Sequence, residues 1–443
     1  MTAVIASIAK LISTQFTGHT LRDQILRGSS AGLLAKVLVA GIAFVCQVLL
    51  ARAMGVTEYG LWVYALTCAN VLSIIPKAGF DVSLVRYVAE YSANRQWGKL
   101  RGIIECSGRF SLIAGVAIAI VSVSLVYGLS DMLSSPAQYS LWLAFAGLPF
   151  MAANSLRSAA LRGLKRVFIA ELPDALLRPL LLTAIVVMLS TVTTLSAIHA
   201  LKIQLVLLAV VFAVGGYLLR KSLRWEVKLA VPEYCMREWI IVSAPLMGMA
   251  GIQIMMTQVD ILMVGTILGT QEAGIYSAGA RLADLVVLGL AGLNLIAAPM
   301  IAELYHTGKK YELRHMIALV RQGGVVLTVL ASLFLVVFGT KLLWLFGGKF
   351  VTAYEPMLFL ILGQVVNALC GPVGIVATMT GHERAAVLVM AAALMLDLAL
   401  NVVLIPRFGL VGAACAAAAS IAFWNIALLI FTKKCLPIGV ELS

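Results

Sequence analysis

Residues 30–60 read SAGLLAKVLVAGIAFVCQVLLARAMGVTEYG, a nearly unbroken apolar run that ends in the turn sequence GVTEYG. An α-helix needs about 20 mainly apolar residues to cross the hydrocarbon core of a bilayer, so this run predicts a membrane-spanning helix. Similar runs fill most of the chain and predict an all-α integral membrane protein. The twelve predicted spans are residues 30–52, 58–83, 104–128, 136–156, 176–196, 198–219, 239–267, 272–300, 319–339, 354–378, 385–405 and 409–431.

The composition agrees with this interpretation. Of the 443 residues, 62% are hydrophobic and 12% are charged, whereas about a quarter of the residues of a soluble domain are charged. A soluble globular protein is therefore excluded. The net charge of +13 comes from short clusters between the apolar runs, so the partner that it indicates is membrane lipid and not nucleic acid.

The distribution of basic residues predicts the orientation. If the N-terminus lies inside, 25 of the 33 Lys and Arg residues fall on the cytoplasmic side and five fall outside. Basic residues are concentrated in cytoplasmic loops of membrane proteins. We therefore expect both termini of this multi-pass protein in the cytoplasm.

The turn sequence recurs in the second half of the chain. Residues 55–60 (GVTEYG) match residues 269–274 (GTQEAG), and residues 162–166 match residues 380–384 at nearly the same offset. Chance recurrence of glycine-rich turns is the alternative explanation. The repeat predicts two six-helix lobes, related by a pseudo-two-fold axis along the membrane normal, with a cavity between them. The predicted parts are a cytoplasmic lead-in (1–28), the first lobe (29–220), a cytoplasmic linker (221–238), the second lobe (239–432) and a cytoplasmic tail (433–443).

Two lysines lie within spans of the first lobe, where ionisable residues are costly and mark pathways or ion pairs. Lys36 lies 19 residues before Gly55, and Lys77 lies 17 residues after Gly60. At about 1.5 Å per residue, both lie roughly 25 to 28 Å below the outer turn. They predict a cationic site near the inner leaflet, and snorkelling of both side chains to the interface is the alternative.

The second lobe carries Arg281 about 10 Å and Asp260 about 13 Å below its outer turn by the same rise. Arginine in a low-dielectric cavity binds phosphate strongly, so Arg281 predicts a mobile anion as substrate. An ion pair between Arg281 and Asp284, three residues apart, is the alternative. Asp81 and Asp397 are candidate proton or cation carriers, as are Asp260 and Asp284, although Asp397 could instead cap polar contacts between helices.

No motif indicates an enzyme. The seven cysteines show no C-x-x-C pair and no His at ligand spacing, so neither a disulfide framework nor a metal site is predicted. Each Gly-Lys pair lacks the first glycine of a Walker A loop. The G-x-S-x-G sequence at residues 28–32 begins a helix, whereas a nucleophile elbow follows a strand. No catalytic residue and no cofactor is assigned.

Three stretches carry a family resemblance: residues 50–61 (LARAMGVTEYGL), residues 84–87 (LVRY) with residues 98–100 (GKL), and residues 401–414 (NVVLIPRFGLVGAA). In this order along twelve spans, the sequence resembles the bacterial polysaccharide flippases. These are the Wzx-type O-antigen and exopolysaccharide transporters of the multidrug/oligosaccharidyl-lipid/polysaccharide exporter superfamily. The resemblance extends from about residue 28 to residue 432.

The related lipid II flippases carry Ala-Asp-Arg-Leu in their eighth span, followed by a proline. This chain has Gly279-Ala280-Arg281-Leu282 and Pro299, so the resemblance implies that Arg281 is a cavity arginine, although the preceding Asp is absent. By the same resemblance, Lys77 after Pro76 and Arg52 before the outer turn are substrate-binding residues. The two additional C-terminal helices of the lipid II flippases are missing, which argues against lipid II as the substrate.

The resemblance implies that an undecaprenyl-diphosphate-linked oligosaccharide is flipped from the cytoplasmic to the periplasmic leaflet of the bacterial inner membrane. The diphosphate would meet Lys36, Lys77 and Arg52 in an inward-open cavity and pass toward Arg281. The polyprenyl tail would remain in lipid at an opening between the lobes. Whether a proton or sodium gradient drives the cycle stays open, and the polymerase and other components of a polysaccharide export system are candidate partners.

Two alternatives stay open. In a drug or organic-cation antiporter of the same superfamily, Asp81, Asp260 or Asp397 would be central, and basic residues in the cavity would be a handicap. A membrane glycan ligase or polymerase would need an outer loop longer than the roughly dozen residues present here.

Overall fold

The computed structural model describes residues 21–192, 195–223 and 225–435, and for residues 21–38, 132 and 435 it describes the backbone alone. Every regular element within these residues is a helix. The helices of the first half are α2 (Leu21–Leu72), α3 (Ile74–Lys77), α4 (Phe80–Ala93), α5 (Trp97–Gly128), α6 (Ser135–Ala146), α7 (Leu148–Gly163), α8 (Val167–Glu171), a π-helical segment (Leu172–Leu177), α9 (Arg178–Ser190) and α10 (Ala197–Ser222). The short α11 (Trp225–Leu229) leads to α12 (Met236–Ile267), α13 (Thr270–His306), α14 (Lys310–Phe346), α15 (Tyr354–Cys370), α16 (Val373–Met379) and α17 (Glu383–Cys435).

These helices account for the twelve predicted crossings. Within the described part of the chain, nine helical segments are long and apolar enough to span a membrane. Two of them each contain two crossings, because Gly55 in α2 (φ 78°) and Gly409 in α17 (φ 60°) adopt left-handed conformations that bend the chain. The pair α6 and α7, which is interrupted at Gly147, adds the remaining crossing.

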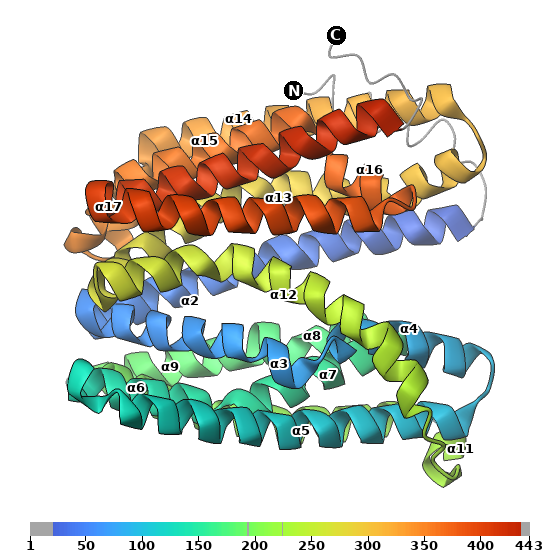
Figure 1. Ribbon diagram of the computed structural model, residues 1–443, viewed down its shortest axis with the longest axis horizontal. Helices are drawn as coiled ribbons and strands as arrows, with labels where there is room; N and C mark the ends of the chain where they lie inside the picture. Colours follow the sequence, from blue (N-terminus) through green and yellow to red (C-terminus); the bar gives the residue numbers. More distant parts are fainter. Residues whose placement is uncertain (1–20, 193–194, 224, 436–443) are drawn as a thin grey trace.

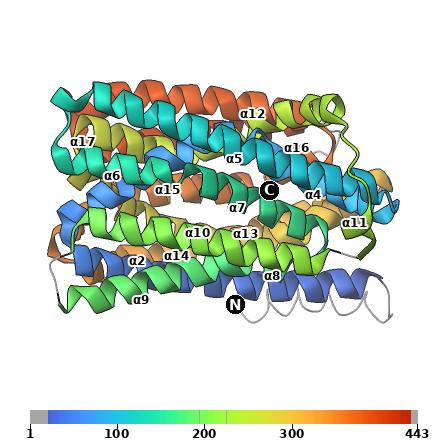
Figure 2. The ribbon, with the colours of Figure 1, turned by 90° about the horizontal axis from the view of Figure 1, so that it is seen from below.

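The helices run roughly parallel, with α13 to α17 in one layer, α3 to α10 in another, and α2 and α12 between them (Figures 1 and 2). The bends inside α2 and α17, at Gly55 and Gly409, and the turn between α12 and α13, at Gly269, lie at one end of the molecule, which we call the glycine-turn end (Figure 1). The connections from α4 to α5 and from α13 to α14 lie at the opposite end, which we call the basic end.

The two halves meet closely at the glycine-turn end, where the two copies of the repeated turn sequence pack on each other. A Cβ atom on Gly274 would lie 2.5 Å from Cα of Gly60, and a Cβ atom on Gly60 would clash with the carbonyl of Thr270. The Thr57 hydroxyl donates a hydrogen bond to Oε1 of Gln271 (3.0 Å). The glycines of the repeat therefore allow two backbones to touch and close this end.

Helix α12 crosses from one layer to the other (Figure 1) and packs on the first half along its length. Gly265 leaves room for the ring of Tyr64, and the hydroxyls of Ser243 and Ser83 are 2.7 Å apart. Near the basic end, the indole of Trp239 is fully buried against the first half. The beginning of α12 thus belongs, by packing, to the core of the first half.

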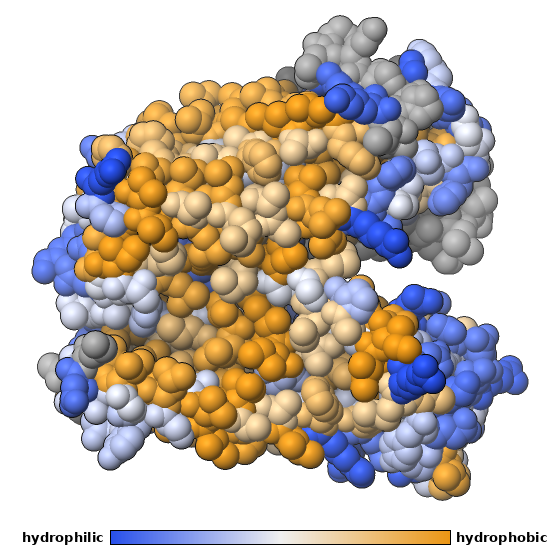
Figure 3. Space-filling view, in the orientation of Figure 1, coloured by the Kyte–Doolittle hydropathy of each residue, from blue (hydrophilic) through white to orange (hydrophobic). Residues whose placement is uncertain are grey.

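At the basic end the halves separate. Figure 3 shows the surface hollowed between the two layers at this end, opposite the glycine-turn end. The same view shows apolar side chains covering the middle of the molecule and polar ones gathered at its ends. This is the surface expected of a protein that is surrounded by lipid at mid-height.

Candidate functional site

The first half contains a cavity of about 490 Å³, which we call the first cavity. Its wall is built mainly by α2, α7, the π-helical segment with α9, and α10, and it is completed by Gln258 of α12 and by Ser277 and Arg281 of α13. Four lining residues are basic and two are acidic. The basic residues are Lys77, Arg162, Arg178 and Arg281, and the acidic ones are Glu171 and Asp174.

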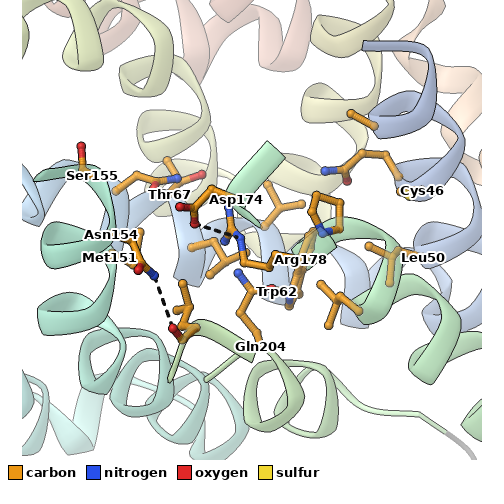
Figure 4. A pocket seen from close by; sticks show the side chains of 18 of the residues that line it. Cys46, Leu50, Trp62, Thr67, Met151, Asn154, Ser155, Asp174, Arg178 and Gln204 are labelled. Carbon is orange, nitrogen blue, oxygen red and sulfur yellow. Dashed lines mark hydrogen bonds and ion pairs between the residues drawn. The ribbon is translucent and has the colours of Figure 1, made fainter. Parts of the chain in front are cut away.

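Asp174 is held between two arginines. Nη2 of Arg157 donates to Oδ2 of Asp174 (2.7 Å), and Nη1 of Arg157 donates to the carbonyl of Val211 (2.8 Å). The side chain of Arg157 is only 5% exposed and lies behind the cavity wall, whereas Asp174 lines the cavity. Arg178 approaches the other carboxylate oxygen at 3.9 Å, and Figure 4 shows Asp174 and Arg178 facing each other in the cavity.

The arginines of the wall keep unused donors. Among the described residues, the buried Nε atoms of Arg162 and Arg178 have no hydrogen-bond partner, and the contact of Arg162 with Glu171 is long at 3.8 Å. A buried charged donor without a partner costs at least about 1 to 3 kcal/mol. An anion bound in the first cavity would offset this cost.

The π-helical segment connects α8 to α9 and carries Asp174 at the cavity wall. Pro173 and Pro179 lack a backbone N–H group, so neither can donate to the preceding turn. A turn widened in this way often lies at a functional site. Glu171 ends α8, Asp174 lies in the π-helical segment and Arg178 begins α9, and all three line the first cavity.

The second half contains a larger cavity of about 830 Å³, which we call the second cavity. Its charged lining residues are Asp260, Asp284, Asp397 and Arg281. Nδ2 of Asn401 donates to Oδ1 of Asp260 (2.9 Å) and lies 3.3 Å from Oδ1 of Asp397. Asp397 is 3% exposed, so two carboxylates from α12 and α17 share one amide in a buried position.

Arg281 lines both cavities and therefore lies where the basic first cavity meets the acidic second one. Its Nη1 is 3.9 Å from Oδ2 of Asp284, and these side chains are 48% and 65% exposed. An ion pair that is long and exposed contributes about 0 to 1 kcal/mol. The charge of Arg281 is thus only weakly compensated.

The other residues expected from the sequence are distributed as follows. Lys77 lines the first cavity. Asp81 lines neither cavity, although its carboxylate acts electrostatically on Lys77. Position 36 lies in α2, but the side chain of Lys36 is outside the described part of the structure.

The expectation that Arg52 faces the inward-open cavity is corrected by the structure. Arg52 lies at the glycine-turn end, where its Nε donates to the carbonyl of Leu345 (2.5 Å). Its guanidinium stacks 5.1 Å from the ring centroid of Trp344. In this conformation Arg52 connects α2 to α14, because the carbonyl of Leu345 in α14 accepts its hydrogen bond.

Sequence analysis missed the arginines of the first cavity wall. Arg157 and Arg162 lie between the predicted spans 136–156 and 176–196, and Arg178 lies at the beginning of the second of these spans; none of the three is among the predicted site residues. The helical segment of the fifth crossing begins at Val167. The predicted span begins later because a search for apolar residues leaves out charged residues that face a cavity. The spacing of Glu171, Asp174 and Arg178 was the available signal.

Comparisons with known proteins place this chain in a family. The profile of a family described as "Polysaccharide biosynthesis protein" matches residues 25–305, which is more than half of the chain. A second profile, MatE, matches residues 245–403. No curated protein matches the chain.

Solved structures of similar fold are transporters. An inward-facing multidrug resistance MATE family transporter of the MOP superfamily is similar with a TM-score of 0.74 and 13% identity, over 89% of this chain and 93% of that one. An outward-facing one gives 0.67 and 15%, over 94% and 98%. A MOP superfamily transporter from Pyrococcus furiosus, described as having a binding pocket of reverse polarity that suggests a different function, gives 0.64 and 14%, over 94% and 98%.

At these identities the structural similarity shows the fold, and the matching family profile shows the relationship. Together they confirm the resemblance to this superfamily, and the first profile covers the motif around Gly55. The protein therefore belongs to the polysaccharide biosynthesis protein family and has the fold of a MOP superfamily membrane transporter.

Proposed function

We propose that the protein flips a polyprenyl-diphosphate-linked oligosaccharide from the leaflet at the basic end to the leaflet at the glycine-turn end, for surface polysaccharide biosynthesis. The observation that carries the proposal is the first cavity, in which Arg162 and Arg178 hold buried donors without partners. Guanidinium groups match the oxygens of a phosphate in charge and geometry. The family of the chain supports a polysaccharide precursor as the substrate.

The arrangement of charges supports a path for the diphosphate. In the first cavity, Lys77 and Arg178 provide charge within the first half, and Arg281 extends it to the boundary with the second half. Two opposite unit charges 4 Å apart attract by about 4 kcal/mol at an effective dielectric constant of 20. This attraction would offset much of the cost of moving a diphosphate out of water.

The closure at the glycine-turn end and the hollow at the basic end support alternating access. In this proposal the conformation described is inward-facing, and the basic end faces the bacterial cytoplasm, as the excess of basic residues indicates. The lobes then rock about the contact of Gly60 with Gly274, and the cavity opens to the periplasm. A single cysteine at position 221 should therefore be inaccessible to an impermeant maleimide added outside intact cells.

For energy coupling, we assign the carboxylate pair Asp260 and Asp397. Two carboxylates that share the amide of Asn401 in a buried position repel each other when both are ionised. A proton or a sodium ion between them removes this repulsion, so its binding would be linked to the packing of α12 against α17. In the proposal this linkage drives the rocking of the lobes.

The second cavity also supports a second candidate, antiport of an organic cation. Three of its four charged lining residues are acidic, and the ring of Trp424 contributes an aromatic face. Cationic ligands favour such surroundings. In this alternative the arginines of the first cavity would be structural.

Deletion of the gene distinguishes the two candidates. If the proposal holds, a polyprenyl-diphosphate-linked glycan accumulates in the cytoplasmic leaflet of the deletion strain, and surface polysaccharide is lost. The accumulated lipid also identifies the sugars. If instead lipid-linked intermediates stay at the wild-type level while the strain becomes sensitive to cationic dyes, the antiporter is the correct assignment.

A further inference from the structure

An apolar groove lies on the outer face of the first half, between α2 and α9. Its volume is about 730 Å³, within the range of roughly 300 to 1,000 Å³ that is typical of ligand sites. Residues of α2 between positions 41 and 49 form one wall, and residues of α9 between positions 180 and 188 form the other. No charged residue lines it. Some of its side chains, Val45 among them, are exposed at the surface.

The groove and the first cavity lie on two sides of the same helix pair. Cys46 of α2 lines both of them. On α9, Arg178 and Leu182 line the first cavity, whereas Leu180 and Thr183 line the groove. A ligand with a charged head and a long apolar chain therefore finds both surfaces within one helix diameter.

We propose that this groove holds the isoprenoid chain of the lipid whose diphosphate occupies the first cavity. The inference rests on the proposed function and adds a site for the tail, which lies within the first half and not between the lobes. Cys46 lines both the groove and the first cavity. A lipid whose head group binds the arginines of the cavity therefore has its tail close to the groove, which favours this occupant over an ordinary phospholipid. Van der Waals packing of the methylene and methyl groups of the isoprenoid chain against the groove would then add to the affinity of the head group, because lipid provides no hydrophobic driving force between apolar surfaces.

The chain offers a residue with which the groove can be filled. A side chain on Gly41 would meet no atom within 4 Å, so a large side chain at this position would occupy the groove and not disturb the core. A side chain on Gly108 of α5 would likewise meet no atom within 4 Å, and this half-buried position does not border the groove. The variants Gly41→Phe and Gly108→Phe are therefore a matched pair.

Binding of undecaprenyl diphosphate to purified protein in nanodiscs tests the proposal, with inorganic diphosphate and dioleoylphosphatidylglycerol as further probes. We expect Gly41→Phe to weaken binding of undecaprenyl diphosphate by about tenfold, because many packing contacts of the tail are lost, and to leave binding of inorganic diphosphate unchanged. Gly108→Phe should bind like the wild type. Arg178→Ala reports on the head group and should weaken binding of both diphosphates.

A second measurement does not depend on a loss of binding. A photo-crosslinking residue, p-benzoylphenylalanine, at position 45 in the groove should attach to labelled undecaprenyl diphosphate. The same residue at position 116, on the lipid-facing side of α5 where Val116 is exposed, should not.

The outcomes distinguish failure of the groove proposal from failure of the proposed function. If Gly41→Phe binds undecaprenyl diphosphate like the wild type, or positions 45 and 116 crosslink equally, while Arg178→Ala loses binding, the groove proposal is overturned and the proposed function stands. If Gly41→Phe weakens binding of phosphatidylglycerol as much as binding of undecaprenyl diphosphate, the groove is a general lipid site. If Gly41→Phe changes the oligomeric state, the groove is a contact between copies of the chain. Either result overturns the proposal. If the wild type does not bind undecaprenyl diphosphate, both proposals fail.

Discussion

Gly215 of α10 leaves the space that the guanidinium group of Arg157 fills. A Cβ atom at position 215 would overlap Nη1 of Arg157, the atom that donates to the carbonyl of Val211. The same guanidinium holds Asp174, which faces Arg178 in the first cavity. The absence of one side chain in α10 thus determines where the charges of the cavity wall lie.

This relationship predicts the effect of Gly215→Ala. The added methyl group should displace Arg157 and leave a buried ion pair broken, which costs about 3 to 5 kcal/mol when one partner is removed. We expect a lower melting temperature in detergent and a loss of surface polysaccharide. Gly216→Ala is the control, because a Cβ atom there meets nothing within 4 Å. Similar behaviour of the two variants would contradict this role of Gly215.

A double substitution tests whether Arg281 serves the substrate or only neutralises Asp284. Their contact is long and exposed, so it should contribute little to stability. Arg281→Ala should abolish export, Arg281→Lys should retain part of it, and Asp284→Ala should not rescue Arg281→Ala. Full recovery of surface polysaccharide in the double variant, with the amount of protein in the membrane unchanged, would remove Arg281 from the substrate path.

A crosslink across the glycine-turn end tests alternating access. Thr57 and Gln271 belong to opposite halves and are hydrogen-bonded, so Thr57→Cys with Gln271→Cys in a cysteine-free background should form a disulfide. Oxidation should stop transport because the halves can no longer separate at this end, and a reductant should restore it. Transport at the full rate by the crosslinked protein would show that this end need not open.

Removal of one charge from the pair Asp260 and Asp397 should stabilise the protein but impair its coupling to the ion gradient. Asp397→Asn removes one of two buried carboxylates that share Asn401, so like-charge repulsion is relieved. We expect the melting temperature to rise by about 2 °C and export to lose its dependence on the proton or sodium gradient. A lower melting temperature with the gradient dependence intact would assign the pair a purely structural role.

How far the sequence predicts this molecule depends on the range of the interaction. The crossings follow from local apolar runs. The repeated turn sequence marks the two segments that pack on each other at Gly60 and Gly274. The acceptor of Arg52 is Leu345, 293 positions away, and the amide beside Asp260 is Asn401, 141 positions away. No local pattern encodes such partners.

The first cavity shows a second limit of the sequence. Arg157, Arg162 and Arg178 occur in a charged stretch between two apolar runs, and charge alone assigns such a stretch to a loop. Whether an arginine faces water or a cavity depends on the packing of α7 and α9 against α10. That packing rests in part on the glycine of α10, whose importance only the three-dimensional neighbourhood reveals.

Translocation of a lipid in proteoliposomes tests the central claim most directly. The lipid-linked glycan that accumulates in the deletion strain is tagged with a fluorophore on its sugar, and a membrane-impermeant quencher reports the leaflet. The wild type and Arg86→Ala, which changes an exposed arginine outside both cavities, should move the tagged lipid between leaflets. Arg178→Ala should slow this movement by about tenfold or more, since a hydrogen bond to a charged group contributes about 1.5 to 3 kcal/mol. Failure of the wild type to move the lipid, together with exchange of tetraphenylphosphonium for protons or sodium ions, would contradict the account.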